Sequence, residues 1–385
     1  MIATIEAEPQ ASTEDWLAIG ERIAGEIARD AARHDADATF VSAGYNTLKQ
    51  AGLFKALVPV ELGGGGADYR QICQVIQRLG AACGSTALAF SMHSHLVAAA
   101  AWRRQHHNAP TEGLLKRVAG EDLVLVSSGG SDWLDSGGTA TPVEGGYRIN
   151  GRKVFSSGCP AGDLLVTSAV LDDPESGPTV LHFAVPMQAA GVTILDTWHV
   201  MGMRGTGSHD IELSDVFVPD AAISGRRPRG PWHPLFHIIS MIAFPLIYSA
   251  YVGVARGARD RAIAMARGKP AAGAALSHRL HLVGAMDNAL TSATLALDAM
   301  IAIAETAQPG VETTSRTMTA RTLAGQAAIA TVERAMEVAG GASFYQAIGL
   351  ERAFRDVQGA RFHPLQEQAQ LDFSGRVALG LDVDG

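Results

Sequence analysis

The sequence predicts a mainly helical protein with an all-β domain in its middle. Apolar residues recur at spacings near 3.6 from Thr13 to about Gly120, and again in long Ala-rich segments after Pro234. Between these regions, after Glu121, the chain changes to short β-prone runs separated by Gly, Pro, Asp and Ser. Because 385 residues exceed what one hydrophobic core usually serves, two or three subdomains with shared interfaces are expected.

The N-terminal helical domain is predicted over residues 1–121. Its periodic pattern is broken at Leu57-Val58-Pro59 and at the glycine run Gly63–Gly66. That run lacks the Lys-Ser/Thr ending of a phosphate-binding loop, and no clear strand precedes it within a βαβ unit. A flexible turn is therefore the favoured interpretation, and nucleoside triphosphate chemistry is not expected.

The middle β domain is predicted over residues 122–225. Its expected strands are 123–126, 147–149, 164–166, 180–185, 192–194 and 210–218. Short strands separated by turn residues favour an antiparallel barrel or sandwich that ends at Pro219. Residues 226–231, with the sequence Arg-Arg-Pro-Arg-Gly-Pro, are the expected linker to the last domain.

The C-terminal domain, residues 226–385, is predicted to be a four-helix bundle. Its expected helices are 239–267, 274–306, 313–339 and 350 to about 363. The stretch from Leu235 to Ala255 is apolar enough to raise a transmembrane interpretation. We favour a buried helix because the stretch contains Pro245, no other segment resembles it, and the central helix of a bundle is apolar all round. Ligand sites are expected where the domains meet.

Composition argues against several classes of function. The net charge is −8 and the basic residues are dispersed, whereas nucleic-acid binding depends on clustered Lys and Arg. Cys73, Cys83 and Cys159 lack metal-site spacing and are too few for a disulfide scaffold, so they are expected to stay reduced. The N-terminus is acidic where an export signal would be basic. We therefore expect a cytoplasmic protein that binds neither nucleic acid nor a membrane.

Single residues give no support for metal or hydrolase chemistry. His93 and His95 lie two positions apart, so on a helix they point in different directions. The other histidine pairs have no carboxylate or Cys partner nearby in the sequence, and no Gly-Xaa-Ser-Xaa-Gly elbow is present. No metal site is expected, and a hydrogen-bonded structural role is the commoner outcome for any one histidine.

Several motifs occur together in a recognisable order. They are Leu57–Gly64, Ser127–Asp132, Asn150–Lys153, Ser156–Gly158, Met201–Ser208, Asp215–Pro219, Gly340-Gly341 and Leu350–Asp356. Over essentially the whole chain, this ordered set resembles the acyl-CoA dehydrogenase superfamily. The resemblance implies a helical domain, a β domain and a helical bundle around a flavin, either FAD or FMN.

The resemblance also implies which residues hold the flavin. In that family two polar-glycine segments line the cofactor, and the second supplies a hydroxyl near its N5 atom, where charge develops on reduction. The matching residues are Ser127, Gly130, Ser131 and Ser156, with Arg204 near the flavin. Whether Ser156 or Ser157 faces the flavin is open. Gly340-Gly341 resembles the turn at which a neighbouring subunit reaches the cofactor, which implies a homotetramer.

The residues that define dehydrogenation are missing from this sequence. Removal of the alpha proton of an acyl-CoA needs a carboxylate base. The two positions that carry this base in the family correspond here to Pro364 and Ala243. His363 lies beside the vacant position, which resembles the flavin-dependent monooxygenase branch of the fold. There a C-terminal histidine, a serine and a histidine of the N-terminal helices surround the reactive flavin carbon.

The leading hypothesis is therefore a monooxygenase that receives reduced flavin from a separate reductase and oxygenates a small molecule. The resemblance assigns acid/base work to His363, whose unperturbed pKa of about 6.5 suits it, a flavin-side hydrogen bond to Ser156 or Ser157, and a substrate contact to His93. One alternative is an acyl-CoA dehydrogenase with a displaced base, served by an electron-transfer flavoprotein. Another is a non-catalytic paralogue that only binds flavin or acyl-CoA.

Overall fold

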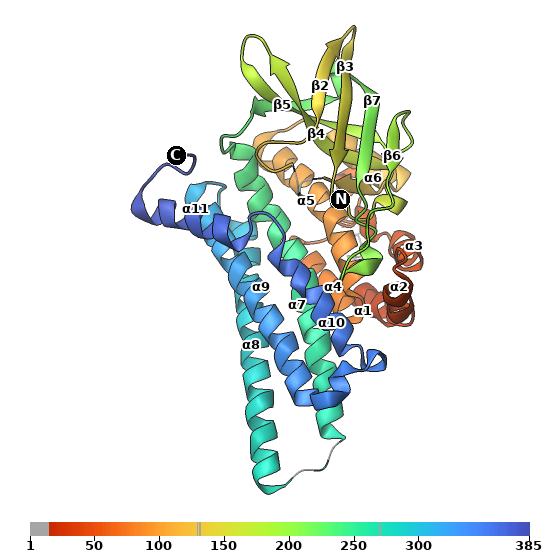
Figure 1. The fold of residues 1–385 in the computed structure, drawn as a ribbon. Coiled ribbons are helices and arrows are strands. Elements are labelled where there is room, and N and C mark those ends of the chain that lie inside the picture. Colours follow the sequence, from red (N-terminus) through yellow and green to blue (C-terminus); the bar gives the residue numbers. More distant parts are fainter. Residues whose placement is uncertain (1–14, 129, 131, 269, 271) are drawn as a thin grey trace, which may run out of the picture.

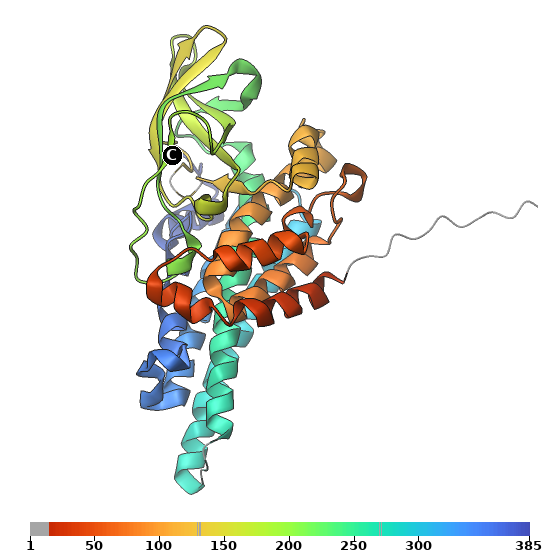
Figure 2. The same cartoon turned by 90° about the vertical axis from the view of Figure 1, so that its right-hand side faces the viewer.

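The computed structural model describes residues 15–385 apart from positions 129, 131, 269 and 271. A β-sheet sits at one end of the molecule, long helices run away from it, and the N-terminal helices pack alongside (Figures 1 and 2). The predicted order of helices, strands and helices is thus confirmed.

The N-terminal region is helical. Its helices are α1 (Trp16–Ile27), α2 (Ala31–Asp37), α3 (Ser42–Gln50), α4 (Tyr69–Ala82), α5 (Gly84–His107) and α6 (Glu112–Glu121). The glycine run after Leu62 forms a turn, in which Gly63 and Gly66 have φ values of +86° and +59°. Glycine adopts this conformation without strain, as expected for a turn.

The middle region forms one eight-stranded sheet. Its strands are β1 (Leu125–Ser127), β2 (Thr139–Val143), β3 (Gly146–Lys153), β4 (Leu164–Asp173), β5 (Gly177–Pro186), β6 (Val192–Ile194), β7 (Ile211–Pro219) and β8 (Ile223–Pro228). The order is β6-β7-β3-β2-β4-β5-β8, with β1 paired to β4.

Two expectations for this sheet need correction. The sheet is mixed, because β4 pairs in parallel with both β1 and β2, whereas an antiparallel arrangement was predicted. Residues 226–228 of the expected linker belong to β8, which pairs with β5 and is held through buried Arg227. An Arg-Arg-Pro sequence carries no β signal, so tertiary contacts decide its conformation.

The C-terminal region is a helical bundle. Its helices are α7 (Pro234–Arg267), α8 (Gly273–Thr306), α9 (Val311–Ala339), α10 (Leu350–Val357) and α11 (Glu367–Leu379), the last of which was not predicted. Apolar side chains of this bundle and of the N-terminal helices share one core, whereas the sheet has a core of its own.

Helix α7 is the central helix of this shared core. Its most apolar window is 94% buried, which agrees with the expected core helix. A second segment, Ala275–Thr306, is also long and apolar enough to cross a membrane, and its most apolar window is 39% buried. The expectation that no other segment resembles the apolar stretch of α7 is therefore wrong. Helix α7 approaches α4 closely at Gly80, where an added Cβ would lie 2.5 Å from the carbonyl oxygen of Ala250.

Candidate functional site

A cavity of about 810 Å³ lies where the three regions meet. It is bounded by α5, the loop after β1, β4, β5, residues 198–203, the first turns of α7 and residues 358–366. Of the predicted site residues, it is lined by His363, Ser157, Ser127 and Gly130, and the substituted base positions Ala243 and Pro364 also face it. Ser131 lies outside the described residues.

His363 is fixed by two hydrogen bonds at the wall of this cavity. Its Nε2 atom lies 2.6 Å from the hydroxyl oxygen of Tyr251, and its carbonyl oxygen accepts a hydrogen bond of 2.5 Å from Arg321. Burial, then the positive charge of Arg321, lowers the pKa of His363 to about 3. The imidazole is therefore neutral near pH 7, which differs from the acid/base group expected from an unperturbed histidine.

The hydrogen bond from Tyr251 defines the tautomer of His363. Tyr251 is 1% exposed, and within the described residues its hydroxyl has no partner other than the His363 imidazole. A buried hydroxyl proton needs an acceptor, so Tyr251 donates to Nε2. The proton of the neutral ring then resides on Nδ1, which makes His363 a neutral hydrogen-bond donor beside the cavity.

The structure corrects the assignment of His93. This residue is 1% exposed and does not line the cavity. Its Nδ1 accepts a 2.9 Å hydrogen bond from the Leu125 backbone N–H, and its Nε2 lies 2.6 Å from the Phe54 carbonyl oxygen. Both ring nitrogens are thus used to join α5 to its neighbours, and none remains for a substrate.

His95 lies in the cavity instead of His93. Its Nδ1 lies 3.2 Å from the Ser91 carbonyl oxygen one turn earlier on α5, so Nδ1 carries the proton. Nε2 has no partner among the described residues and is a free acceptor. Burial lowers the pKa of His95 to about 4, so the ring is neutral near pH 7.

The two adjacent serines separate cleanly. Ser157 lines the cavity, and its hydroxyl lies 2.8 Å from that of Ser208. Ser156 is fully buried, does not line the cavity and donates a 3.3 Å hydrogen bond to the Lys153 carbonyl oxygen. Of the two, Ser157 is therefore the residue that can contact a ligand in the cavity.

Aromatic side chains provide the apolar part of the same wall. Phe155 adopts a φ of +57°, and its side chain is 56% exposed although the residue is large and apolar. Its ring centroid lies 6.0 Å from that of Trp198, and both residues line the cavity. Two rings beside the Ser157 hydroxyl provide surfaces for a planar ligand with a polar edge.

Asp132 is the one carboxylate among the described residues that line the cavity. Its Oδ2 atom accepts a 2.7 Å hydrogen bond from the fully buried Lys153 ammonium and another of 2.7 Å from Ser128. Burial lowers the pKa of Lys153, while Asp132 opposes that effect by favouring the charged ammonium. A carboxylate with these donors is a structural anion and is not available as a base.

The remaining predicted cofactor residues, Arg204, Gly340 and Gly341, do not themselves line the cavity. Arg204 is partly buried next to the buried 205–208 segment, and its Nε has no partner in the described part of the chain. Gly340 and Gly341 begin a 3-10 turn directly after α9 and are not among the residues that line the cavity. Their predicted contacts with a cofactor stay predictions.

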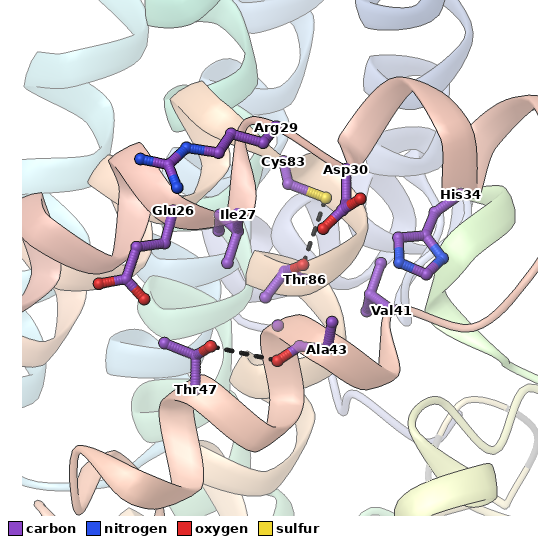
Figure 3. Close-up of a pocket in the computed structure, with 11 residues that line it drawn as sticks. Glu26, Ile27, Arg29, Asp30, His34, Val41, Ala43, Thr47, Cys83 and Thr86 are labelled. Atoms are coloured by element: carbon purple, nitrogen blue, oxygen red, sulfur yellow. Dashed lines mark hydrogen bonds between the residues drawn. The ribbon is translucent and has the colours of Figure 1, made fainter.

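A second, smaller cavity of about 370 Å³ opens between the N-terminal helices (Figure 3). Thr86 donates a hydrogen bond of 3.2 Å to the Cys83 sulfur in its wall, and burial raises the pKa of that thiol. His34 Nδ1 lies 2.9 Å from the Thr39 hydroxyl. A protonated, hydrogen-bonded thiol is not a nucleophile, so Cys83 offers no reactive group to this cavity.

Sequence patterns alone did not reveal Tyr251 and His95. Tyr251 lies in the apolar stretch interpreted as core, and its hydroxyl was the available signal that one side of this helix is polar. His95 was paired in sequence with His93, and only the helix position distinguishes them. No cluster of three or more metal-binding side chains occurs over residues 15–385 outside the four undescribed positions.

The class of fold is a helical domain, a β domain and a helical bundle, with a cavity lined by aromatic and hydroxyl groups at their junction. Residues 18–114, 127–216 and 246–368 match the N-terminal, middle and C-terminal domains of acyl-CoA dehydrogenase, respectively. The chain belongs to the acyl-CoA dehydrogenase superfamily, which confirms the resemblance and the fold expected from the sequence.

Several relatives are named as nitrososynthases or monooxygenases. The chain is 29% identical to amino sugar nitrososynthase RubN8 of Streptomyces rubradiris, over 96% of this chain and 91% of that protein. It is 30% identical to a dibenzothiophene monooxygenase of Rhodococcus qingshengii, over 66% of this chain and 62% of that protein. The structure of KijD3 in complex with FMN and a dTDP-amino sugar matches with a TM-score of 0.88 and 27% identity, over 99% and 97% of the chains.

Proposed function

We propose that this protein is a flavin-dependent monooxygenase. It would oxygenate a small molecule with molecular oxygen, using reduced flavin that a separate reductase supplies. The observation that carries the proposal is His363, a neutral donor oriented by Tyr251 in a cavity whose described lining has no free carboxylate. Relatives that are named as monooxygenases and nitrososynthases, and one FMN-bound structure, support the same class of reaction.

The residues present fit a flavin. The Phe155 and Trp198 rings offer apolar faces, and the Ser157 hydroxyl offers a hydrogen bond to the polar edge of the ring system. The cavity volume of about 810 Å³ is in the range of cofactor and small-ligand sites. When bound in its reduced form, the flavin supplies the electrons that activate molecular oxygen.

The side chains around this position would perform three tasks. His363 would donate its Nδ1 proton in a hydrogen bond to the reacting oxygen, and Tyr251 would hold the ring in that tautomer. His95 would accept a hydrogen bond from the substrate through Nε2. Apolar residues of α5 and α7 would exclude water. They include Leu88, Met92, Leu96, Ile239, Phe244 and Ile247.

The structure disfavours the dehydrogenase alternative. A displaced base would have to reach the substrate from the bundle helices, yet no described Asp or Glu of those helices lines the cavity. Asp132, the carboxylate that does, is held by Lys153. General-base catalysis requires a free acceptor within hydrogen-bond reach of the proton, and Asp132 does not meet that condition.

The test begins with purified protein mixed anaerobically with reduced FMN or FAD and then with oxygen. We expect protein-bound flavin to reoxidise on a slower time course than free flavin, because the closed site controls access of water and protons. A panel of acyl-CoA compounds is expected to leave bound oxidised FAD unbleached. Bleaching would establish the dehydrogenase, whereas bound flavin that neither reacts with oxygen nor bleaches would establish a non-catalytic paralogue.

We further propose a cytoplasmic homotetramer. Its support is compositional and geometric: Cys73, Cys83 and Cys159 are buried and unpaired, as in a reducing compartment. Phe344 and Tyr345, next to Gly340-Gly341, are 86% and 71% exposed, as expected for residues that a neighbouring subunit covers. Light scattering on the purified chain tests the mass, and a monomer would contradict this proposal.

A further inference from the structure

One end of the cavity carries positively polarised groups that the reaction does not use. Arg103 near the end of α5, His182 on β5 and His233 immediately before α7 all line the cavity. The positive charges of Arg227 and, to a smaller extent, Arg103 act on His182, and all of these residues line the same cavity. Burial and these charges lower the pKa of His182 to about 4.

Arg103 has no counterion. In the described part of the chain its guanidinium makes no hydrogen bond or ion pair, and burial lowers its pKa with no carboxylate acting against that effect. Its neighbour Arg104 differs completely, because that guanidinium pairs with Glu61 at 2.9 Å and with Glu112 at 3.7 Å. An unpaired guanidinium that lines a cavity is a donor without an acceptor.

His182 presents a second donor. Its Nε2 atom accepts a hydrogen bond of 3.1 Å from the Arg227 Nε, so the proton of the neutral ring resides on Nδ1. The other nitrogens of Arg227 bind the carbonyl oxygens of Trp133, Leu134 and Pro228. The hydrogen bonds of Arg227 are therefore made within the protein, and one of them fixes the tautomer of His182. The His182 Nδ1–H has no acceptor among the described residues.

His233 presents a third donor at the start of α7. Its Nδ1 accepts a 3.2 Å hydrogen bond from the Leu235 backbone N–H, so Nε2 carries the proton and has no described partner. The position before the first turn of a 34-residue helix also carries the positive end of the helix dipole. The indole N–H of Trp133, another lining residue, is buried without an acceptor in the described chain.

We infer that Arg103, His182 and His233 form a subsite for a phosphate-type oxyanion carried by a ligand of this cavity. Three donors that line one cavity beside a helix N-terminus match a tetrahedral group with several terminal oxygens, such as a phosphate or diphosphate ester. Asp132 faces the same end, but Lys153 neutralises it.

The geometry favours the substrate, and not the flavin, as the molecule that carries this anion. This assignment rests on the proposed function. The Gly205 N–H binds the Ser85 hydroxyl at the start of α5, near the Ser157–Ser208 pair. Arg103 lies 18 residues after Ser85 on that helix, about 27 Å along its axis. The oxyanion subsite is thus at the other end of α5 from the hydroxyl assigned to the flavin ring.

Calorimetric titration of the flavin-free, full-length protein with inorganic pyrophosphate, in phosphate-free buffer, tests the site. We expect binding to be at least about tenfold weaker in Arg103→Gln and unchanged in Arg104→Gln, the matched control on the same helix. His182→Phe supplies a second variant with a smaller expected loss. Equal affinity of the wild type and Arg103→Gln, or no binding to the wild type, would overturn the inference.

A second titration separates the two sources of the anion. FMN and riboflavin differ by the phosphate, and their binding can be followed by flavin fluorescence. Unchanged affinities of both flavins in Arg103→Gln support the substrate as the source. Weaker binding of FMN alone would overturn that assignment. Flavin reoxidation, measured on the same variants, reports on the proposed function independently, because Arg103 is remote from Ser157.

Discussion

Two faces of helix α5 carry histidines only two residues apart, and their surroundings differ in every respect that matters. His93 sits between the Phe54 carbonyl and the Leu125 amide, with both ring nitrogens bonded to backbone. His95, rotated by about 200° around the helix, bonds its own helix through Nδ1 and leaves Nε2 at the cavity. Burial lowers the pKa of both rings to about 4.

The comparison shows that a lowered pKa does not identify a functional histidine. What separates the two residues is the number of ring nitrogens left without a protein partner. His363 belongs with His95 on this criterion, because Tyr251 occupies its Nε2 and its Nδ1 has no described partner. The predictions below test whether this criterion separates catalytic from structural histidines.

The largest effect is expected for His363→Ala. Loss of the Nδ1 donor should reduce oxygenated product by about 10²–10³-fold, while reduced flavin is still consumed, because general acid/base and hydrogen-bonding groups contribute on this scale. The measurement is the ratio of product to released hydrogen peroxide on a substrate found by screening. His363→Asn retains a donor and should keep more of this ratio. An unchanged ratio in His363→Ala would remove the residue from the mechanism.

His93→Ala is expected to act on stability and not on chemistry. It leaves a buried amide and a buried carbonyl without partners and creates a cavity, at a cost of about 2–4 kcal/mol in the free energy of unfolding. Thermal and urea denaturation measure this cost. His93→Gln, which supplies one donor and one acceptor, should recover part of it. If His93→Ala instead changed product formation in folded protein, the comparison between the two faces of α5 would fail.

Much of the fold was available from the sequence because its signals are local. The long periodic segments of α7, α8 and α9 and most strands follow from apolar spacing, and the motif order identified the superfamily. Strands β2 and β8 were not predicted, and in β8 contacts with β5 stabilise an Arg-Arg-Pro sequence. The choice of Ser157 over Ser156 and of His95 over His93 depends on side-chain direction at the junction of three regions, which no local pattern encodes.

Tyr251→Phe removes only the hydroxyl that bonds His363, and therefore tests how the His363 ring is oriented. A donor on Nε2 stabilises the neutral imidazole, so its removal should raise the pKa of His363 from its present value of about 3. We expect about a tenfold loss of product ratio at pH 7, close to 1.4 kcal/mol. Between pH 8 and pH 5 the wild type should be flat, and the variant should lose activity as the pH falls. Parallel profiles would assign Tyr251 a packing role only.

The smallest expected effect is on the pH dependence of the free energy of unfolding, to which His93 and His95 contribute alike. Each folded ring stays neutral down to about pH 4, whereas the unfolded ring takes up a proton near pH 6.5. Between these values the unfolded chain binds more protons, so the free energy of unfolding falls as the pH falls, by about 1 kcal/mol per histidine from pH 7 to pH 5.5. His93→Gln and His95→Gln should each remove one such contribution in denaturation curves measured at the two pH values, while only His95→Gln alters the affinity for substrate. A loss of stability at low pH that survives both substitutions would mean that other buried histidines, such as His182 or His363, govern acid sensitivity.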